Sequence, residues 1–382
     1  MAKKHILYLD GLKGVLCCCI VLLHYQLAFF PESYIGFGAN PAADPVAIVM
    51  RNLPFSLFSN SSFSLYVLFG IIAYLIARSF FQAEDPMRGL QIKAVKRYFR
   101  FCLPVFVITI IFYALFVHGF LCYKDLYDIT GSYWLLAIMP PVVSSEQLLF
   151  KALLECYFEN DLQIVTVLWC MHIIFIGSFL TFGGLALLGA SRYRYLGYIV
   201  CLICGCFYQK YLVFLIGVIC ADYEPTEVQS KKLGEVLILA GIGLGFIPTV
   251  FLPAGITLSF TYALAVGLFL AGLQRCSWLQ VLLSTAWLVK AGRYIFSVIL
   301  VHMLVLLTIS AYIYPVFLDW TGGNIVLSFW QMFIPSVICI SGLSVLFYKC
   351  FEQPSMRLAD WVSKIYMDKN HGEIDSSCHK NL

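Results

Sequence analysis

The sequence predicts an all-α fold, a polytopic transmembrane helix bundle of about ten spans with both termini in the cytoplasm. Hydrophobic residues make up 61% of the chain and charged residues 12%, against about 45–50% and about 25% in an average soluble domain. Apolar stretches of about 17–25 residues recur along the chain, and a helix of that length crosses a bilayer. These features exclude an ordinary soluble enzyme and predict a multi-pass protein of the cell membrane, with the lipid bilayer as a direct partner.

Ten apolar segments are interpreted as spans, and the fifth and sixth are short. They cover residues 6–30, 61–80, 101–120, 164–188, 195–208, 211–221, 234–252, 256–274, 293–312 and 325–348. Together they predict one transmembrane domain over residues 1–362, followed by a short polar cytoplasmic tail at 363–382.

Lysine and arginine fall in alternate connections between these spans. On one side lie Lys3, Lys4, Arg78, Arg88, Lys93, Lys96, Arg97, Arg100, Arg192, Arg194, Lys231, Lys232, Arg275, Lys290, Arg293, Lys349, Arg357, Lys364 and Lys369. The positive-inside rule predicts that this side is the cytoplasm.

The opposite connections contain few cations. Residues 31–60 have Arg51 as their one cation, and residues 121–163 hold six acidic residues against Lys124 and Lys151. This second loop has a turn-rich centre, Met139-Pro140-Pro141, and an amphipathic stretch at 145–158. It is therefore predicted to form a lid over an outward-facing cavity.

Net charge and cysteine placement argue against two further kinds of site. The net charge is only +4, and no basic stripe is interleaved with aromatic residues outside the apolar runs, so we expect no nucleic-acid partner. Most of the 15 cysteines lie inside apolar runs, where Cys behaves as a small hydrophobe, and we expect no metal site. Cys122 and Cys156 share the predicted outer loop, and the sequence leaves open whether they pair.

Ionisable side chains inside a span are costly and therefore indicate function. The first span contains Asp10, Lys13 and His24. About three helical turns separate Lys13 from His24, which places both on one face and about 16 Å apart along the axis. A neutral imidazole near mid-membrane is suited to accept and return a proton. The alternative is a buried histidine that bonds a hydroxyl or carbonyl of a neighbouring helix.

Arg97 and Arg100, at i and i+3, share a face at the predicted cytoplasmic end of the third span. Guanidinium groups there suit phosphate oxygens, although positive-inside anchoring explains a basic cluster equally well. His302 and His172 are further intramembrane imidazoles that are candidates for either function or structural hydrogen bonding.

The opening motif resembles a known family. Leu9-Asp10-Gly11-Leu12-Lys13-Gly14, with ten residues between the basic Lys13 and His24, resembles the start of the acyltransferase-3 family of membrane O-acyltransferases. Weaker matches follow in order over about residues 6–360: Tyr66 to Ile71 ending in Arg78-Ser79, Arg97-x-x-Arg100 with Pro104, Leu168-Trp169 leading to Gly177-Ser178, Tyr294 to His302, and Phe351-Glu352-Gln353-Pro354.

This resemblance implies a ten-helix bundle that passes an acyl group, usually acetyl, from cytoplasmic acyl-CoA to a hydroxyl of a carbohydrate or glycolipid acceptor. By position, it implies that His24 is the catalytic histidine and Lys13 its basic partner, and Asp10 of the same motif is the third residue assigned to the catalytic group. Arg97 and Arg100, with Arg78, are the residues expected to bind the CoA phosphates. The chain departs from the family pattern at Phe69, where a serine is frequent, and at Ile174, where a glutamate is common.

We therefore expect an integral membrane O-acyltransferase, with acetyl-CoA as the expected acyl donor and a surface polysaccharide or glycolipid as acceptor. A polytopic transporter or permease is the alternative from another class, because intramembrane charges also line substrate pathways. A third alternative is a member of the family without catalytic activity.

Overall fold

The computed structural model describes residues 6–33, 49, 60–159, 164–225, 231–246 and 257–378, and these residues form helices and no strand. The N-terminal half contains α1 (Leu7–Phe29), η1 (Pro31–Ser33), α4 (Ser61–Phe81), α5 (Pro86–Val117), α6 (Tyr123–Thr130), α7 (Tyr133–Ala137), α8 (Ser145–Phe150), η2 (Lys151–Glu155), α9 (Cys156–Phe158), η3 (Thr166–Leu168), α10 (Trp169–Gly184) and η4 (Leu185–Gly189).

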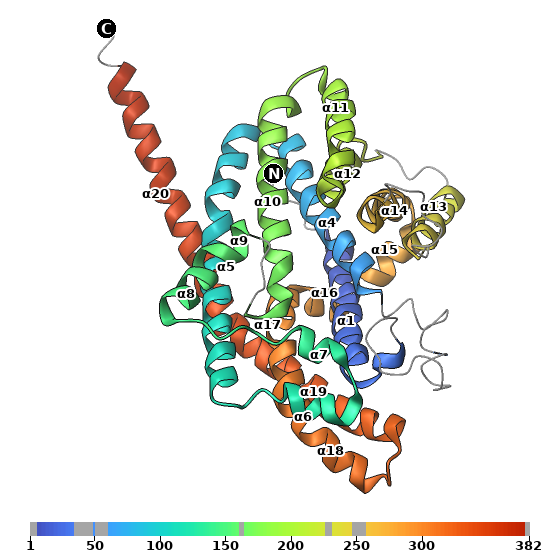
Figure 1. The fold of residues 1–382 in the computed structure, drawn as a ribbon. Coiled ribbons are helices and arrows are strands. Elements are labelled where there is room, and N and C mark those ends of the chain that lie inside the picture. Colours follow the sequence, from blue (N-terminus) through green and yellow to red (C-terminus); the bar gives the residue numbers. More distant parts are fainter. Residues whose placement is uncertain are drawn as a thin grey trace.

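The C-terminal half continues in the same all-helical manner (Figure 1). It contains α11 (Arg194–Phe207), η5 (Gln209–Tyr211), α12 (Leu212–Asp222), α13 (Lys231–Gly245), α14 (Leu258–Leu273), α15 (Ser277–Leu283), α16 (Ala286–Arg293), α17 (Ile295–Val305), η7 (Leu306–Ser310), α18 (Ala311–Trp320), α19 (Ile325–Phe347), η8 (Tyr348–Glu352) and α20 (Gln353–Cys378). Helix α20 thus extends into the region where the sequence predicts a polar tail.

Six helices within the described ranges are long and apolar enough to cross a membrane, or seven if α14 and α15, bent by 96°, form one span. The six coincide with the first four and the last two predicted spans. The remaining four predicted spans correspond to α11, α12, α13 and α14, which have 11 to 16 residues. At 1.5 Å per residue these helices are shorter than the roughly 30 Å hydrocarbon core. The count of ten spans is therefore not confirmed, and residues 247–252 of the seventh lie outside the described residues.

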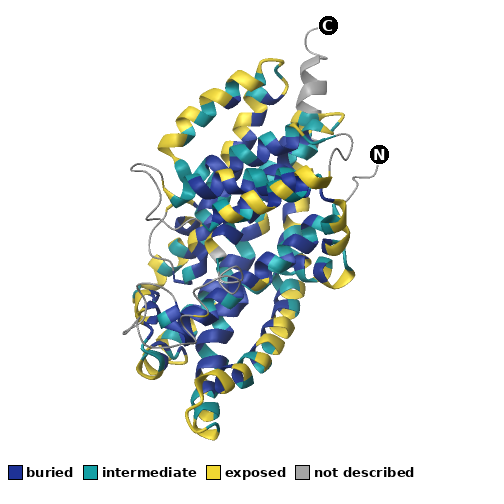
Figure 2. Ribbon diagram, turned by 90° about the vertical axis from the view of Figure 1, so that its right-hand side faces the viewer, coloured by how far each residue is buried: buried dark blue, intermediate teal, exposed yellow. Residues whose placement is uncertain are grey.

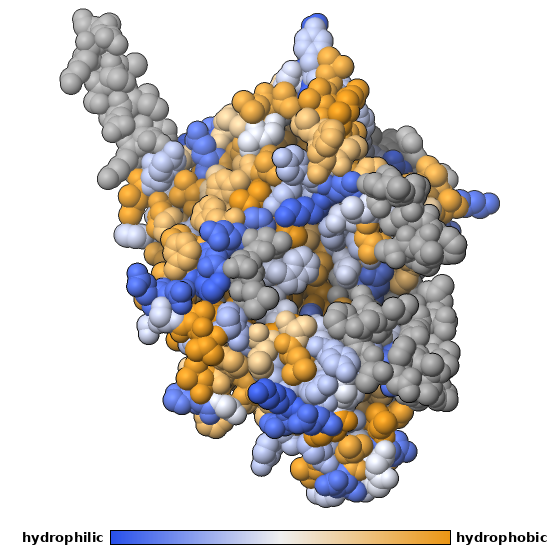
Figure 3. Space-filling model, in the orientation of Figure 1, coloured by the Kyte–Doolittle hydropathy of each residue, from blue (hydrophilic) through white to orange (hydrophobic). Residues whose placement is uncertain are grey.

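Apolar side chains on the outer surface agree with a membrane protein. Phe207 on α11 is 83% exposed, Leu187 in η4 is 82% exposed and Ile338 on α19 is 67% exposed. Figure 3 shows such residues spread over much of the visible face rather than gathered in one patch. Exposed apolar side chains in this number are unusual on a soluble monomer, whereas lipid tails solvate them without penalty.

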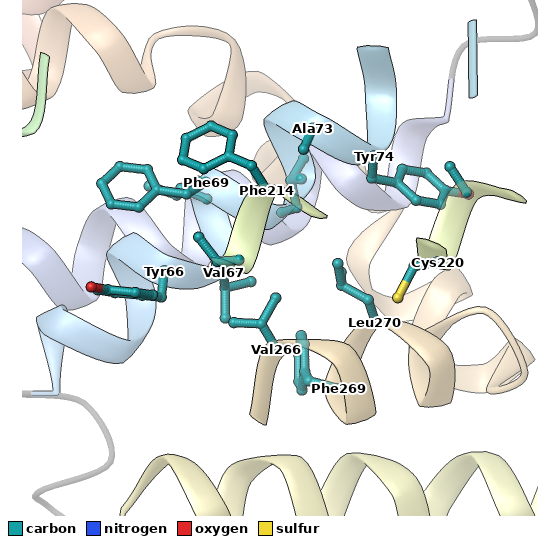
Figure 4. Close-up of a cluster of buried hydrophobic side chains, with 14 of the residues drawn as sticks. Tyr66, Val67, Phe69, Ala73, Tyr74, Phe214, Cys220, Val266, Phe269 and Leu270 are labelled. Atoms are coloured by element: carbon teal, nitrogen blue, oxygen red, sulfur yellow. The ribbon is translucent and has the colours of Figure 1, made fainter. Parts of the chain in front are cut away.

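Helix α1 runs through both halves of the buried core. Its first half contributes Leu9, Leu12 and Leu16 to a cluster with α4, α12 and α14. Its second half, from Val21 to Phe29, belongs to a second cluster with α5, α17 and α19. Figure 4 shows part of the first cluster, and Figure 2 shows that buried residues concentrate along the centre of the bundle. Residues on α1 are consequently fixed by packing on several sides.

Two glycines bring α1 into backbone contact with α15 and α16. A Cβ added at Gly11 would lie 1.7 Å from the carbonyl oxygen of Leu283, and one added at Gly292 would lie 1.8 Å from that of Asp10. Only residues without a side chain permit this approach, which is typical of helix pairs in membranes. The Asp10 to Gly14 motif is thereby fixed against the C-terminal part of the chain.

The predicted outer loop is largely helical. Residues 145–158 form α8, η2 and α9 in succession, as their amphipathic pattern indicates. Ser132 Oγ donates a 2.6 Å hydrogen bond to the carbonyl of Leu27 at the end of α1, which ties α7 to the bundle. In Figure 1, α6 and α18 lie at the bottom, whereas the α10–α11 connection and the far end of α20 lie at the top. That the top faces the cytoplasm stays a prediction from the positive-inside rule.

Candidate active site

The structure brings His24 of α1 and His302 of α17 together in the interior of the bundle. His24 Nδ1 lies 3.1 Å from His302 Nε2, and their ring centroids are 4.9 Å apart. His302 is fully buried, and the ring of Trp134 from α7 lies 5.7 Å from that of His24. Two imidazoles of the bundle and an aromatic residue of the predicted outer loop thus form one cluster.

Backbone carbonyls define the tautomer of both histidines. His24 Nδ1 is 2.9 Å from the carbonyl oxygen of Ile20, and His302 Nδ1 is 3.0 Å from that of Val298. Because a carbonyl oxygen only accepts, each Nδ1 must be protonated, and in a neutral imidazole each Nε2 then has a lone pair. His24 Nε2 is therefore the nitrogen able to take a proton from a substrate.

A cavity of about 530 Å³ lies among α1, α4, α5, α10, α17 and α20. Its cationic residues are Lys13, Lys93, Lys96, Arg97 and Arg100, and one acidic residue, Asp360, also lines it. Most of the remaining wall is apolar, above all along α4 from Leu65 to Ile76. Basic groups beside an apolar channel suit a ligand with an anionic end and an extended organic chain.

On α17 the cavity lining extends as far as Ile299, and it includes neither His24 nor His302. Ile295, Phe296 and Ile299 of α17 line it, and His302 lies one helical turn beyond Ile299. A second cavity, of about 460 Å³ between α10, α11 and α12, has no charged residue in its lining. The cation-lined cavity is therefore the better candidate for an anionic substrate.

Two contacts hold Arg97 at the cavity. Its Nη2 donates to Ser178 Oγ on α10, and its guanidinium lies 5.2 Å from the ring centroid of Phe101. Its Nε is buried and has no hydrogen-bond partner among the residues that the structure describes. A buried guanidinium N–H without a partner is costly, and an oxygen-rich anion would satisfy it.

The other predicted site residues fall into two groups. Lys13 pairs with Asp10 at 2.8 Å and lines the cavity with Arg97 and Arg100. Both Lys13 and His24 lie on the continuous helix α1, so Lys13 is about three turns from the imidazole. Arg78 instead pairs with Glu224 at 2.8 Å and is not part of the cavity lining. The structure thus separates the cations from His24 and places Arg78 elsewhere.

The two residues that depart from the family pattern lie in different environments. Phe69 is fully buried and stacks on Phe214, with ring centroids 5.9 Å apart. Ile174 lines the cavity, and Ser178, one turn further along α10, provides the hydroxyl that accepts from Arg97. A neutral hydroxyl therefore lies near Arg97 on the helix where a carboxylate is common.

A buried carboxylate from the end of the chain lies beside the cavity. Glu352 is 4% exposed and accepts a 2.6 Å hydrogen bond from Ser297 Oγ, and Arg100 is the cation whose charge acts on it. Phe296, next to Ser297, lines the cavity. The sequence signal for Glu352 was its place in the closing Phe351 to Pro354 match.

His172 and the two loop cysteines lie apart from the histidine pair. His172 Nε2 is 3.0 Å from the hydroxyl of Tyr211, and neither residue contacts His24. Cys122 and Cys156 are both free thiols. The pairing that the sequence left open is therefore not formed.

The described residues thus form a bundle of apolar helices with a cation-lined cavity and a buried histidine pair, which defines the class as an integral membrane protein. Comparison with protein families is more specific. The model of the acyltransferase-3 family, described as an acyltransferase domain, matches residues 6–349, nearly the whole chain. The protein belongs to this family, as the opening motif indicates. No curated protein and no solved structure matches the chain.

Proposed function

We propose that the protein is a membrane O-acyltransferase that moves an acyl group, with acetyl as the expected one, from cytoplasmic acyl-CoA to a hydroxyl of a surface polysaccharide or glycolipid. The observation that supports this proposal most is the cavity, because it joins a cationic region to an apolar wall that includes Ile299, one helical turn before His302 on α17. Acyl-CoA has the matching order of groups, with phosphates at one end and a thioester at the other.

In this proposal the CoA phosphates bind near Arg97 and Arg100, with Lys13 and Lys93 adding positive charge to the same wall. The Nε of Arg97 gains the hydrogen-bond acceptor that it lacks. The pantetheine arm then extends along the apolar channel toward α17.

The transfer step uses the lone pair on His24 Nε2. This nitrogen takes the proton from the acceptor hydroxyl while the hydroxyl oxygen attacks the thioester carbonyl carbon. The carbon–sulfur bond breaks, and the imidazolium returns its proton to the CoA thiolate. One positioned general base supplies about 10²–10⁴ in rate, and substrate positioning in the cavity supplies the remainder.

The test is consumption of labelled acyl-CoA by purified protein in lipid, comparing the wild type with His24→Gln. Gln keeps a hydrogen-bonding amide but takes up no proton, so we expect transfer to fall at least about 100-fold while the amount of folded protein stays the same. Full activity in His24→Gln would exclude the general base. Uptake of a solute without thioester cleavage by the wild type would instead favour a transporter.

A further inference from the structure

We infer that His302 is a positioning residue that holds the His24 imidazole in the tautomer and orientation needed for proton transfer. This role rests on the proposed function. It concerns a residue from the C-terminal part of the chain that neither the opening motif nor the basic cluster includes.

The direction of the contact between the two rings follows from their backbone bonds. The Val298 carbonyl takes the Nδ1–H of His302, so His302 Nε2 has no proton and can only accept. The group opposite it is the Nδ1–H of His24, at 3.1 Å. That N–H is therefore shared between two acceptors, His302 Nε2 and the carbonyl oxygen of Ile20.

This sharing matters because the Ile20 carbonyl alone is an incomplete restraint. Ile20 lies one turn before His24 on the same helix, so its carbonyl follows any movement of α1 and restricts the ring from one side only. His302 contacts the same N–H from another helix and is itself fully buried. If the His24 ring flips, Nδ1–H loses both acceptors, so the pair favours the orientation that leaves Nε2 available.

The pair also acts during the proposed reaction. Once Nε2 has taken a proton, His24 has a positive charge, and its Nδ1–H becomes a stronger donor to His302. In the part of the chain that the structure describes, no carboxylate is hydrogen-bonded to His24. His302 thus supplies the orienting acceptor that a carboxylate supplies in many catalytic triads.

Two substitutions separate positioning from simple packing. His302→Gln keeps an oxygen able to accept from His24, whereas His302→Leu fills similar space without any acceptor. We expect His302→Leu to lower kcat about 10- to 100-fold and to leave KM for acyl-CoA unchanged. This loss is smaller than the full rate factor of a general base, about 10²–10⁴, because His24 itself is still present. His302→Gln should recover most of this loss. His172→Leu is the matched control, because it removes an intramembrane histidine that contacts Tyr211 rather than His24.

Equal loss in the Leu and Gln variants, or a rise in KM alone, would overturn the positioning role while leaving the proposed function intact. If the wild type consumes no acyl-CoA, the proposed function fails instead. Even then, the contact between His24 and His302 can be tested by a measurement that needs no activity. ¹⁵N NMR of labelled imidazoles in lipid should show His24 protonated at Nδ1 in the wild type, and a mixture of tautomers in His302→Leu. An unchanged spectrum in that variant would contradict the inference.

Discussion

Replacing Gly11 with alanine should destabilise the protein far more than a methyl group normally does. The added Cβ would lie 1.7 Å from the Leu283 carbonyl oxygen and 2.7 Å from its carbon, whereas ordinary contacts begin at 3.4 Å. The obstacle is backbone, so α1 and α15 must separate by about 1.5–2 Å. Overpacking in a core costs about 1–3 kcal/mol, and gaps of about 0.5–1 Å already lose a quarter to a half of the dispersion energy between facing atoms.

We therefore expect Gly11→Ala to cost about 3 kcal/mol or more, which lowers Tm by at least about 6 °C at about 2 °C per kcal/mol. Thermal unfolding of the purified protein in one detergent measures this shift. Gly89→Ala is the matched control, because no atom lies within 4 Å of the added Cβ, and alanine is favoured over glycine in a helix by about 1 kcal/mol. Equal Tm values for the two variants would refute the backbone contact between α1 and α15.

Three further predictions concern the cavity, the thiols and the membrane. Arg97→Lys should raise KM for acyl-CoA at least about fivefold with a smaller change in kcat, since an ammonium replaces the fork that contacts Ser178; unchanged KM at fixed salt would favour simple membrane anchoring. Burial raises the pKa of the Cys156 thiol to about 12, so Cys156 should alkylate slowly at pH 8, and the mass of alkylated protein should be the same with and without reductant; a difference would indicate a disulfide. In sealed vesicles, acyl-CoA should be consumed only from the face with Arg97 and Arg100 and only with acceptor on the other face; reaction with both on one face would refute transfer across the membrane.

Local patterns were enough to predict the long helices. The apolar run after Ile6 gives α1 between Leu7 and Phe29, within one residue of the predicted limits. The third span begins earlier than predicted, at Pro86, because the basic segment before it continues the same helix. Asp85 caps that helix by accepting from the Arg88 amide, and Pro86 suits its first turn. Hydropathy detects where a chain is apolar but not where a polar helix joins it.

Contacts between residues far apart in the chain could not be predicted from the sequence. His24 and His302 were each recognised as intramembrane imidazoles, yet 278 positions separate them and no spacing rule connects them. The sequence also grouped Arg78 with Arg97 and Arg100 by charge, whereas Glu224, two residues after the end of α12, pairs with Arg78 outside the cavity lining. Such partners depend on how helices pack, which a single sequence does not encode in a local pattern.

The two ends of α1 explain why the predicted site residues lie in separate places. Lys13 lines the cationic part of the cavity and His24 lies beside His302, and about 16 Å of rigid helix separates them. An extended donor whose phosphates and thioester bind at different depths requires such a separation. Gly11 fixes one end of this helix against Leu283, and the contact with His302 fixes the other. A shift at Gly11 should therefore change donor binding as well as stability, whereas loss of the His302 contact should change kcat alone.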